Sequence, residues 1–200
     1  VRQPAHCCGI VGHKPSYGLV SKAGVLPLVA SMDHVGPLTR SVADAALLLA
    51  AIQGADPDDP HSVDGGRDTY LAGISPSLDG AVVGVPRRFF FDGGDPEVIK
   101  VVEQALPVFK ELGAQVVDRD LPNIEQALRE ADVTFREIAD ACGEALAANP
   151  EAFSDSFRKR FEGVTRHSDD RYSSAQEFRQ AFRDQVDEVL THCDILAMPT

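Results

Sequence analysis

The stretch AVVGVPRRFFFDGGDPEVIKVVEQALPVFKELGAQVVDRDLP (81–122) decides the fold. It opens with a short apolar run, AVVGVPRR (81–88), which predicts a buried strand closed by a proline. Asp95 and Pro96 then predict the start of a helix, because Asp is a favoured N-cap and Pro fits the first helical position. A second strand is predicted over 114–122, so we expect a strand–helix–strand unit with parallel strands and a right-handed crossover. This unit predicts an α/β fold, with part of a mixed, mainly parallel sheet flanked by helices.

The helix that follows Asp95 carries apolar residues at helical spacing. We expect it to end at Gly113 and to kink at Pro107, because a proline removes a backbone donor from the helix interior. Its predicted core face consists of Val98, Val101, Val102, Ala105, Phe109 and Leu112.

A buried helix is also predicted before this unit, over 42–53. Ser41 and Asp44 form a start that resembles a capping box, with Asp in place of Glu, and Gly54 fits a C-terminal cap. The acidic, turn-rich stretch 56–68 that follows predicts a solvated loop, because it lacks the ligand pattern of a calcium loop.

The second half of the chain shows mainly helical patterns. Residues 123–149 are predicted to be helical with a break near 132–134, and 151–163 to form a short amphipathic helix. Ser174 and Glu177 form a second capping box, which predicts the start of the last helix there. The final DILAMPT (194–200) predicts a third buried strand.

The net charge and the cysteine content argue against some classes of binding partner and site. The net charge of −12 argues against nucleic acid, whose binding relies on cationic side chains, and gives no reason to expect a membrane partner. The four cysteines, Cys7, Cys8, Cys142 and Cys193, match neither a secreted disulfide framework nor a zinc ribbon. We therefore expect reduced thiols and a cytoplasmic location.

Residues 1–40 predict tightly folded, irregular backbone of the kind that builds sites, because glycines and prolines alternate with short apolar runs. His6, Cys7, Cys8 and His13 offer soft ligands, but adjacent cysteines are poorly spaced for a tetrahedral metal, so we expect none. Cys8 is better interpreted as a small buried hydrophobe than as a nucleophile.

Three charged residues in this region are candidate site residues. Asp33 and Arg40 flank a Gly-Pro turn, and the simpler hypothesis is an ion pair that holds the loop. Arg2 could bind a carboxylate or backbone carbonyls through its fork of donors. The pattern alone leaves a substrate contact open for all three.

The stretch VRQPAHCCGIVGHKPSYGLVSKAGVLPLVASMDHVGPLTRSVADAALLL (1–49) resembles the amidase signature family. The resemblance includes Arg2-x-Pro-Ala, the Cys-Gly-Ile-Val-Gly phrase at 8–12, Lys14-Pro15, and Asp33 followed by Gly-Pro and Arg40. It is weaker in the remaining three quarters of the chain, although Gly-Val-Pro at 84–86 and the strand at 194–200 fit. His6, Cys7 and His13 depart from the commonest residues of the family.

The resemblance implies a hydrolase with a Ser–Ser–Lys triad and no cofactor. In such enzymes the nucleophilic Ser lies in a glycine-rich run that precedes the position of Val1, so we expect no catalytic residue within 1–200 and an inactive isolated chain. Arg2, Asp33 and Arg40 are expected to support the active-site backbone. One incomplete amidase domain is expected, with the rest of the signature region at 1–54 and the strand–helix–strand unit and helical pocket region at 55–200.

The resemblance leaves more than one function open. The first hypothesis is hydrolysis of a small-molecule carboxamide. The assembly considered for it is a homodimer. The alternatives are a non-catalytic amidase-like module and a glutamine-dependent amidotransferase subunit. A mononucleotide-binding domain is a weaker alternative, since Gly93-Gly94 stands without the Lys-Ser/Thr of a P-loop.

Overall fold

The computed structural model describes residues 1–66 and 70–200, and these form two compact units. Unit 1 consists of Val1–Ser75 with Asp140–Glu144, and unit 2 of Pro76–Ala139 with Ala145–Thr200. The last two residues of the predicted acidic loop, 67 and 68, lie outside the described residues.

Unit 1 begins with a helix that the sequence does not predict. The elements of unit 1 are α1 (Arg2–Cys8), β1 (Val11–Gly12), β2 (Leu38–Thr39), α2 (Val42–Ile52) and the 3-10 helix η1 (Tyr70–Gly73). Pro4 is tolerated because it lies in the first turn of α1, where its missing N–H has no helical acceptor. Gly9 ends the helix with φ 63°, a left-handed conformation that favours glycine.

The short strands β1 and β2 pair antiparallel, with Val11 opposite Thr39. Gly12 allows α1 to pack closely against β1. A Cβ atom at Gly12 would lie 2.5 Å from the Cβ of Ala5 and 2.9 Å from the carbonyl oxygen of Val1. The packing of α1 therefore depends on the absence of a side chain at this position.

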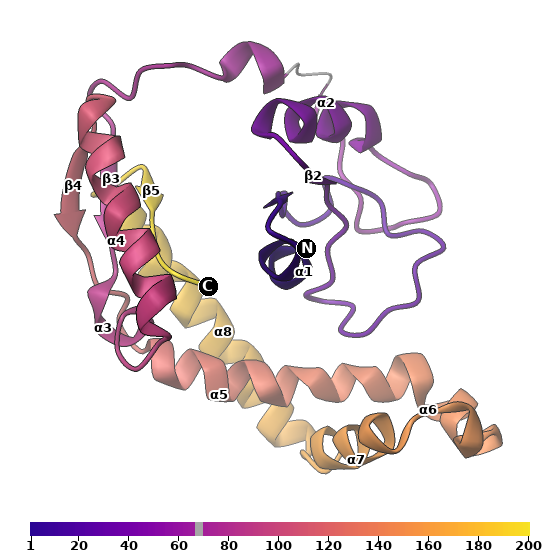
Figure 1. Cartoon of the computed structure of the whole chain (residues 1–200). Helices are drawn as coiled ribbons and strands as arrows, with labels where there is room; N and C mark the ends of the chain where they lie inside the picture. Colours follow the sequence, from indigo (N-terminus) through magenta and orange to yellow (C-terminus); the bar gives the residue numbers. More distant parts are fainter. Residues whose placement is uncertain (67–69) are drawn as a thin grey trace. The chain divides into compact units, whose positions relative to one another are not determined.

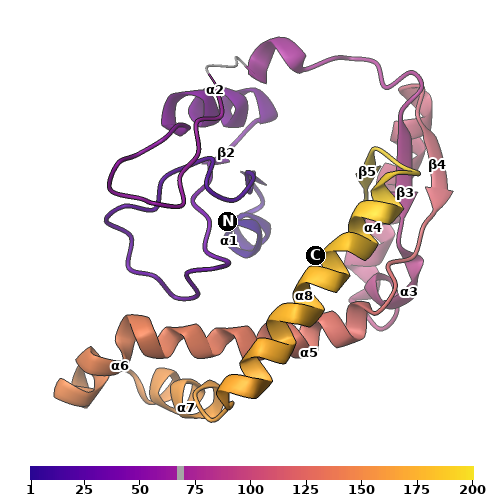
Figure 2. The same ribbon diagram turned by 180° about the vertical axis from the view of Figure 1, so that it is seen from behind.

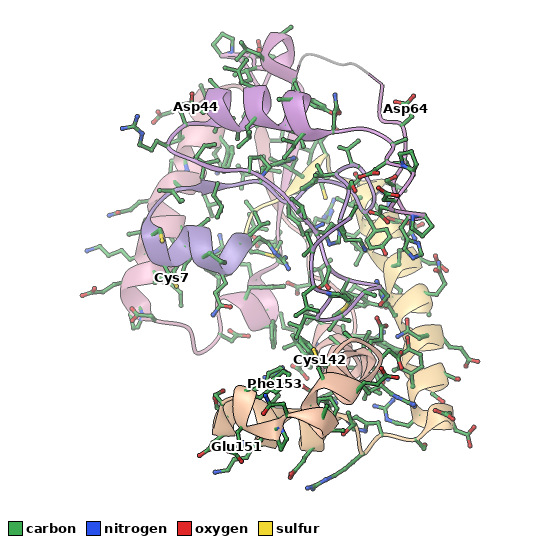
Figure 3. All side chains as sticks on the ribbon, turned by 90° about the vertical axis from the view of Figure 1, so that its right-hand side faces the viewer. Cys7, Asp44, Asp64, Cys142, Glu151 and Phe153 are labelled. Carbon is green, nitrogen blue, oxygen red and sulfur yellow. The ribbon has the colours of Figure 1, made fainter. Side chains whose placement is uncertain are left out.

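Helix α2 begins as predicted, and the Oγ of Ser41 accepts a hydrogen bond from the N–H of Asp44 at 3.1 Å. Figure 3 labels Asp44 on this helix. The prediction of a buried helix holds for one face only. Its buried residues are Ala45, Ala46 and Leu49, whereas Val42 is 60% exposed and Leu47 is 55% exposed. Only one face of α2 is therefore covered within the described part of unit 1.

Unit 2 contains the predicted parallel sheet, whose strands are β3 (Val82–Val85), β4 (Gln115–Asp118) and β5 (Ile195–Leu196). The order is β4-β3-β5, and β3 pairs parallel with both neighbours. Val83 and Val85 of the central strand are fully buried. The α/β prediction is thus confirmed, although Ile195 of the third strand is 44% exposed.

Helix α4 (Pro96–Glu111) connects β3 to β4 and lies along the sheet (Figure 1). It begins as predicted, since the carboxylate of Asp95 accepts the N–H of Glu97 at 2.8 Å. It continues through Pro107 as one helix. The predicted core face is partly wrong: Leu106 is 5% exposed, whereas Val101 is 64% exposed and Leu112 is 40% exposed.

The segment between β3 and α4 is a strained turn. The four-residue element α3 (Arg87–Phe90) contains Phe89 at φ 76°, a conformation that a bulky side chain rarely adopts. Arg87, at the start of this turn, forms an ion pair with Glu103 of α4 and another with Asp118 of β4, the latter at 3.0 Å.

A helical arm leads from β4 to β5. Its elements are α5 (Ile124–Thr134), the 3-10 helices η2 (Phe135–Glu137) and η3 (Pro150–Ala152), α6 (Ile138–Ala148), α7 (Asp155–Val164) and α8 (Asp169–Leu190). The predicted break falls at η2, one residue beyond the expected range. Helix α5 lies beside α8 (Figure 2), and Asn123 donates to Gln185 at 3.0 Å.

The predicted start of the last helix is wrong. Ser168 caps α8 by accepting the N–H of Arg171 at 3.2 Å, six residues before the expected cap. Ser174 lies inside the helix and donates its hydroxyl to the carbonyl of Asp170 at 2.9 Å. Ser174 is followed by Glu177 at the capping-box position whereas Ser168 is followed by Arg171, so the pattern favours the serine that lies inside the helix.

Candidate functional site

Asp33 fixes the backbone of a loop in unit 1. Its Oδ2 accepts the N–H of Leu28 at 2.7 Å and the N–H of Val29 at 3.0 Å. Val29 is 2% exposed, and its carbonyl accepts the N–H of Asp33 at 2.8 Å. One half-buried carboxylate therefore holds one end of the loop in a defined position.

Lys22 and Tyr17 hold the same loop from its other side. The Nζ of Lys22 donates to the hydroxyl of Tyr17 at 2.8 Å and to the carbonyl of Ala30 at 2.9 Å. The Tyr17 hydroxyl donates to that carbonyl as well, at 2.9 Å. The ammonium also lies 4.1 Å from the Tyr17 ring centroid, a favourable cation–π distance.

The imidazole of His34 is placed beside these groups. Its Nδ1 lies 2.6 Å from the carbonyl oxygen of Met32, a contact that assigns the proton to Nδ1 and leaves Nε2 as an acceptor. The ring meets Tyr17 edge-on at 5.4 Å between centroids. Burial first, and then the charges of Lys14, Lys22 and Arg2, lower the pKa of His34, although its contact with Met32 opposes them. The imidazole is therefore neutral at pH 7.

Arg2 and Lys14 add positive charge to this region. Lys14 is exposed as a whole, but partial burial of its ammonium, and then the charge of Arg2, lower its pKa. Lys14 donates to the carbonyl of Pro15 at 3.1 Å. Within residues 1–66 and 70–200, no ion pair shorter than 4.0 Å joins Arg2, Lys14 or Lys22 to a carboxylate. The cluster can therefore accept an anion or an oxygen acceptor.

The hypothesis of an ion pair between Asp33 and Arg40 is wrong for the part of the chain that the structure describes. The carboxylate of Asp33 is occupied by backbone N–H groups, and Arg40 follows β2 with an exposed side chain. Arg2 lies close enough to His34, the residue after Asp33, for its charge to lower the pKa of the imidazole. Among the same described residues, the structure shows no comparable contact for Arg40.

The acidic loop is more structured than the sequence indicates. Asp59 is 6% exposed and accepts the N–H groups of Lys22 and His61, at 2.8 and 3.0 Å. The N–H of Lys22 first, and then that of His61, lower the pKa of Asp59. Asp56 accepts the hydroxyl of Ser21 at 2.7 Å. These two carboxylates hold Ser21 and Lys22 in place, so the expected solvated loop is a structural support.

The cysteines near the chain start are exposed thiols. Cys7 (labelled in Figure 3) and Cys8 lie on α1. Both are exposed, so the expectation of a buried Cys8 is wrong for this structure. Across the described ranges, no group of three or more His, Cys, Asp or Glu side chains could hold a metal ion.

Unit 1 also contains a cavity of about 650 Å³ next to α2. Its wall is largely apolar and includes Val42, Ala46, Leu49 and Ile74, and its polar side chains include Lys14 and Tyr70. Sequence reasoning missed this cavity, as it missed the roles of Lys22 and His34. Lys14 belongs to the Lys14-Pro15 pair of the family resemblance, and that resemblance was the available signal for it.

Comparisons with known proteins agree with the resemblance. The Amidase family model matches residues 1–200. One glutamyl-tRNA(Gln) amidotransferase subunit, from Geobacter sp. (strain M21), is 45% identical over 128 residues, which are 64% of this chain and 26% of that protein. The amidase of Pseudomonas putida is 36% identical over 202 residues, which cover 100% of this chain and 43% of that protein.

A solved structure also resembles the chain, with a TM-score of 0.88 at 32% identity, over 98% of this chain and 42% of that one. It is described as a vestigial protein complex that reveals the evolutionary origins of an s-triazine catabolic enzyme. The chain spans less than half the length of these relatives. None of the helices within the described residues has the length and apolar character needed to cross a membrane. By the match over its whole length, the chain belongs to the Amidase family of amidase signature enzymes.

Proposed function

We propose that this chain is part of an amidohydrolase that converts a small-molecule carboxamide into a carboxylate and ammonia or an amine. The observation that carries the proposal is the family match across residues 1–200. The identity of 36% to the Pseudomonas putida amidase across the whole chain supports it. The Ser nucleophile, the bridging Ser and the Lys come from polypeptide outside these 200 residues in this proposal, so the isolated chain is inactive.

Arg2, Asp33 and Arg40 support the active-site backbone in this proposal. The two backbone hydrogen bonds that Asp33 accepts favour this role, because they fix a loop next to a cluster of positive charge. Residues 1–54 then supply the rest of the signature region. Residues 55–200 supply the strand–helix–strand unit and the helices that shape the pocket.

A chimera tests the function directly. Residues 1–200 replace the matched region of the Pseudomonas putida amidase, and ammonia release is measured with a panel of aliphatic and aromatic amides. We expect hydrolysis by the chimera, a large loss with Asp33→Ala, a smaller loss with Asp33→Asn, and unchanged rates with Asp58→Ala, which alters an exposed carboxylate in the same unit. A folded chimera that hydrolyses none of the amides would contradict the proposal.

A glutamine-dependent amidotransferase subunit is the second candidate. It is favoured by the identity of 45% to the glutamyl-tRNA(Gln) amidotransferase subunit of Geobacter sp. (strain M21). The corresponding chimera with that protein distinguishes the two. Ammonia release from glutamine alone, stimulated by the other subunits of that relative, supports the transferase, whereas hydrolysis of simple amides without them supports the hydrolase.

Location and assembly complete this proposal. We propose a cytoplasmic protein that acts on a small-molecule amide, can form a homodimer, and has neither a nucleic-acid nor a membrane partner. The net charge of −12 supports the absence of nucleic acid. Cell fractionation, and light scattering on a gel-filtration column, test the location and the homodimer.

A further inference from the structure

A loop in unit 1 exposes three large apolar side chains, which form its apolar tip. These residues, Val25, Leu26 and Leu28, are 50%, 75% and 45% exposed, whereas Val29, the next residue, is 2% exposed. The run AGVLPLVASM (23–32) contains no charged residue, although a quarter of the chain is charged. Exposed apolar side chains that gather on one surface mark a binding site, and the lack of charge favours an uncharged, apolar group as the ligand.

Hydrogen bonds hold both ends of this loop in place. At its start, the N–H of Lys22 donates to the buried carboxylate of Asp59 at 2.8 Å, and the Nζ of the same lysine donates to the carbonyl of Ala30 at 2.9 Å. At its end, the carboxylate of Asp33 accepts the N–H of Leu28 at 2.7 Å. The apolar tip therefore projects from a fixed base, and a fixed base places binding side chains more precisely than a free loop does.

The segment at the end of this loop lies close to the first residue of the chain. A Cβ atom at Gly12 would lie 2.9 Å from the carbonyl oxygen of Val1, so β1 packs directly against the start of α1. The next residue, His13, donates its N–H to the carbonyl of Pro37 at 3.0 Å. A Cβ atom at Gly36 would lie 2.2 Å from the carbonyl oxygen of His13. The end of the loop is therefore connected to Val1 by direct packing through β1.

The proposed function puts the reacting carbonyl in this same region. In that proposal the nucleophilic Ser belongs to a glycine-rich run that precedes Val1, so the acyl group of the substrate lies near Val1. Burial is the main cause of the lowered pKa of His34, and the charge of Arg2 contributes to it, so Arg2 lies close to the residue after Asp33. Because Leu28 is bonded to Asp33, the apolar tip is placed to contact the acyl group.

We propose that Val25, Leu26 and Leu28 form a wall of the acyl pocket and select carboxamides that carry an uncharged, apolar acyl chain. This inference rests on the proposed function and deepens it, because it names the class of substrate and the residues that recognise it. The apolar tip contributes binding and no chemical step: moving an alkyl chain from water onto these side chains stabilises the bound substrate in proportion to the apolar area buried. Amides with longer alkyl chains are therefore preferred over acetamide.

Alanine substitutions test this role in the Pseudomonas putida chimera. Primary amides from acetamide to hexanamide are compared by kcat/KM, so that ammonia is always the leaving group and only the acyl chain changes. We expect Leu26→Ala and Leu28→Ala to lower the ratio of hexanamide to acetamide by about tenfold or more, since one methylene group in an apolar pocket is worth roughly tenfold. The controls, Leu47→Ala and Val63→Ala, alter side chains outside the loop that are 55% and 49% exposed. They should leave the ratio within about twofold, and equal ratios in tip and control variants would overturn the proposal.

A lysine at the apolar tip reverses the test. Leu28→Lys should raise the preference for hexanamide with a terminal carboxylate over hexanamide itself by about tenfold, because an ammonium attracts that carboxylate, whereas Leu47→Lys should not. A residue that only stabilised the loop would not produce this change of preference. Tip variants that lower the Tm of the chimera but leave both ratios unchanged would show that the enzyme's own polypeptide covers the tip, which would contradict the proposal.

A binding measurement keeps the two proposals distinguishable. The affinity of hexanamide for the chimera is measured by ligand-observed NMR, which needs no turnover. A chimera that hydrolyses no amide but loses about tenfold or more of its hexanamide affinity with Leu28→Ala, and not with Leu47→Ala, would refute the amidase function and retain the apolar site. An active chimera whose chain-length preference is unaltered by the tip variants would retain the function and refute the site. An inactive chimera that does not bind hexanamide would refute both.

Discussion

Val29 and Asp33 exchange two hydrogen bonds. The N–H of Asp33 donates to the carbonyl of Val29 at 2.8 Å, and the N–H of Val29 donates to the Oδ2 of Asp33 at 3.0 Å. The same oxygen accepts the N–H of Leu28 at 2.7 Å. This arrangement closes the loop on itself, so Asp33 acts on the backbone and not on another charged side chain.

Replacement of Asp33 should therefore destabilise the loop by removing an acceptor. We expect Asp33→Ala to cost about 2 kcal/mol in the free energy of unfolding, because two backbone donors lose a charged partner. Asp33→Asn should cost about half as much, because its amide oxygen can still accept. Urea unfolding checks both values, with the exposed Asp58→Ala as control. Equal stability of the Asp33→Ala and Asp58→Ala variants would rule out the loop-closing role.

Asp59 should contribute to stability in a way that depends on pH. Hydrogen bonds from Lys22 and His61 lower its pKa from the ordinary value of 3.8. A carboxyl group with a lowered pKa in the folded state stabilises the fold fully above its unfolded pKa, and the contribution is lost as the pH falls through the folded value. Asp59→Asn should thus destabilise the chain near pH 6, and the difference from wild type should shrink below about pH 4.

Urea unfolding at several pH values measures this difference for Asp59. Asp58→Asn is the matched control, because that carboxylate is exposed in the same loop. A difference between wild type and Asp59→Asn that stays constant from pH 6 to about pH 3 would show that the Asp59 charge is not involved.

Tyr172 should titrate unusually late. Burial first, and then its hydrogen bond to Glu137 at 2.7 Å, raise its pKa from 10.0 to about 12. Because the folded state favours the neutral phenol, this stabilisation is present below pH 10.0 and is lost as the pH rises through about 12. Absorbance at the tyrosinate band should show a late step that is absent in Tyr172→Phe. A variant that keeps the late step would contradict the assignment.

The sequence was sufficient for the strand–helix–strand unit, because its signals are local. The apolar run at 81–88 and the Asp95-Pro96 start specify a strand and a helix whatever lies around them. Helix α1 was missed because Gly9, Gly12 and Pro4 suggested irregular backbone, although Pro4 is harmless in a first turn. The start of α8 lies six residues before the predicted one because the Ser-x-x-Glu pattern occurs at Ser174, inside the helix, whereas the actual cap, Ser168, has Arg171 at that position.

The site was predicted less completely than the fold. Charge in a region rich in glycine and proline selects Arg2, Asp33 and Arg40 from the sequence. In the structure the charge of Arg2 acts on His34 and Asp33 accepts backbone N–H groups of its own loop, whereas no such contact occurs for Arg40 among the described residues. The contacts of Lys22 with Tyr17 and Ala30 join residues through an irregular loop, and such contacts have no periodicity that a sequence displays. The link from Lys22 to Asp59 spans 37 residues and is equally invisible to local patterns.

Hydrophobic periodicity does not determine which face of α4 is buried. Leu106 is 5% exposed and was not assigned to the core face, whereas Val101 was assigned to it and is 64% exposed. Because α4 is apolar on more than one side, spacing alone selects no single face. We expect Leu106→Ala to cost about 2–4 kcal/mol and Val101→Ala less than about 0.5 kcal/mol. Urea unfolding of the two variants measures both, and a larger loss at Val101 would mean that the opposite face of α4 is buried.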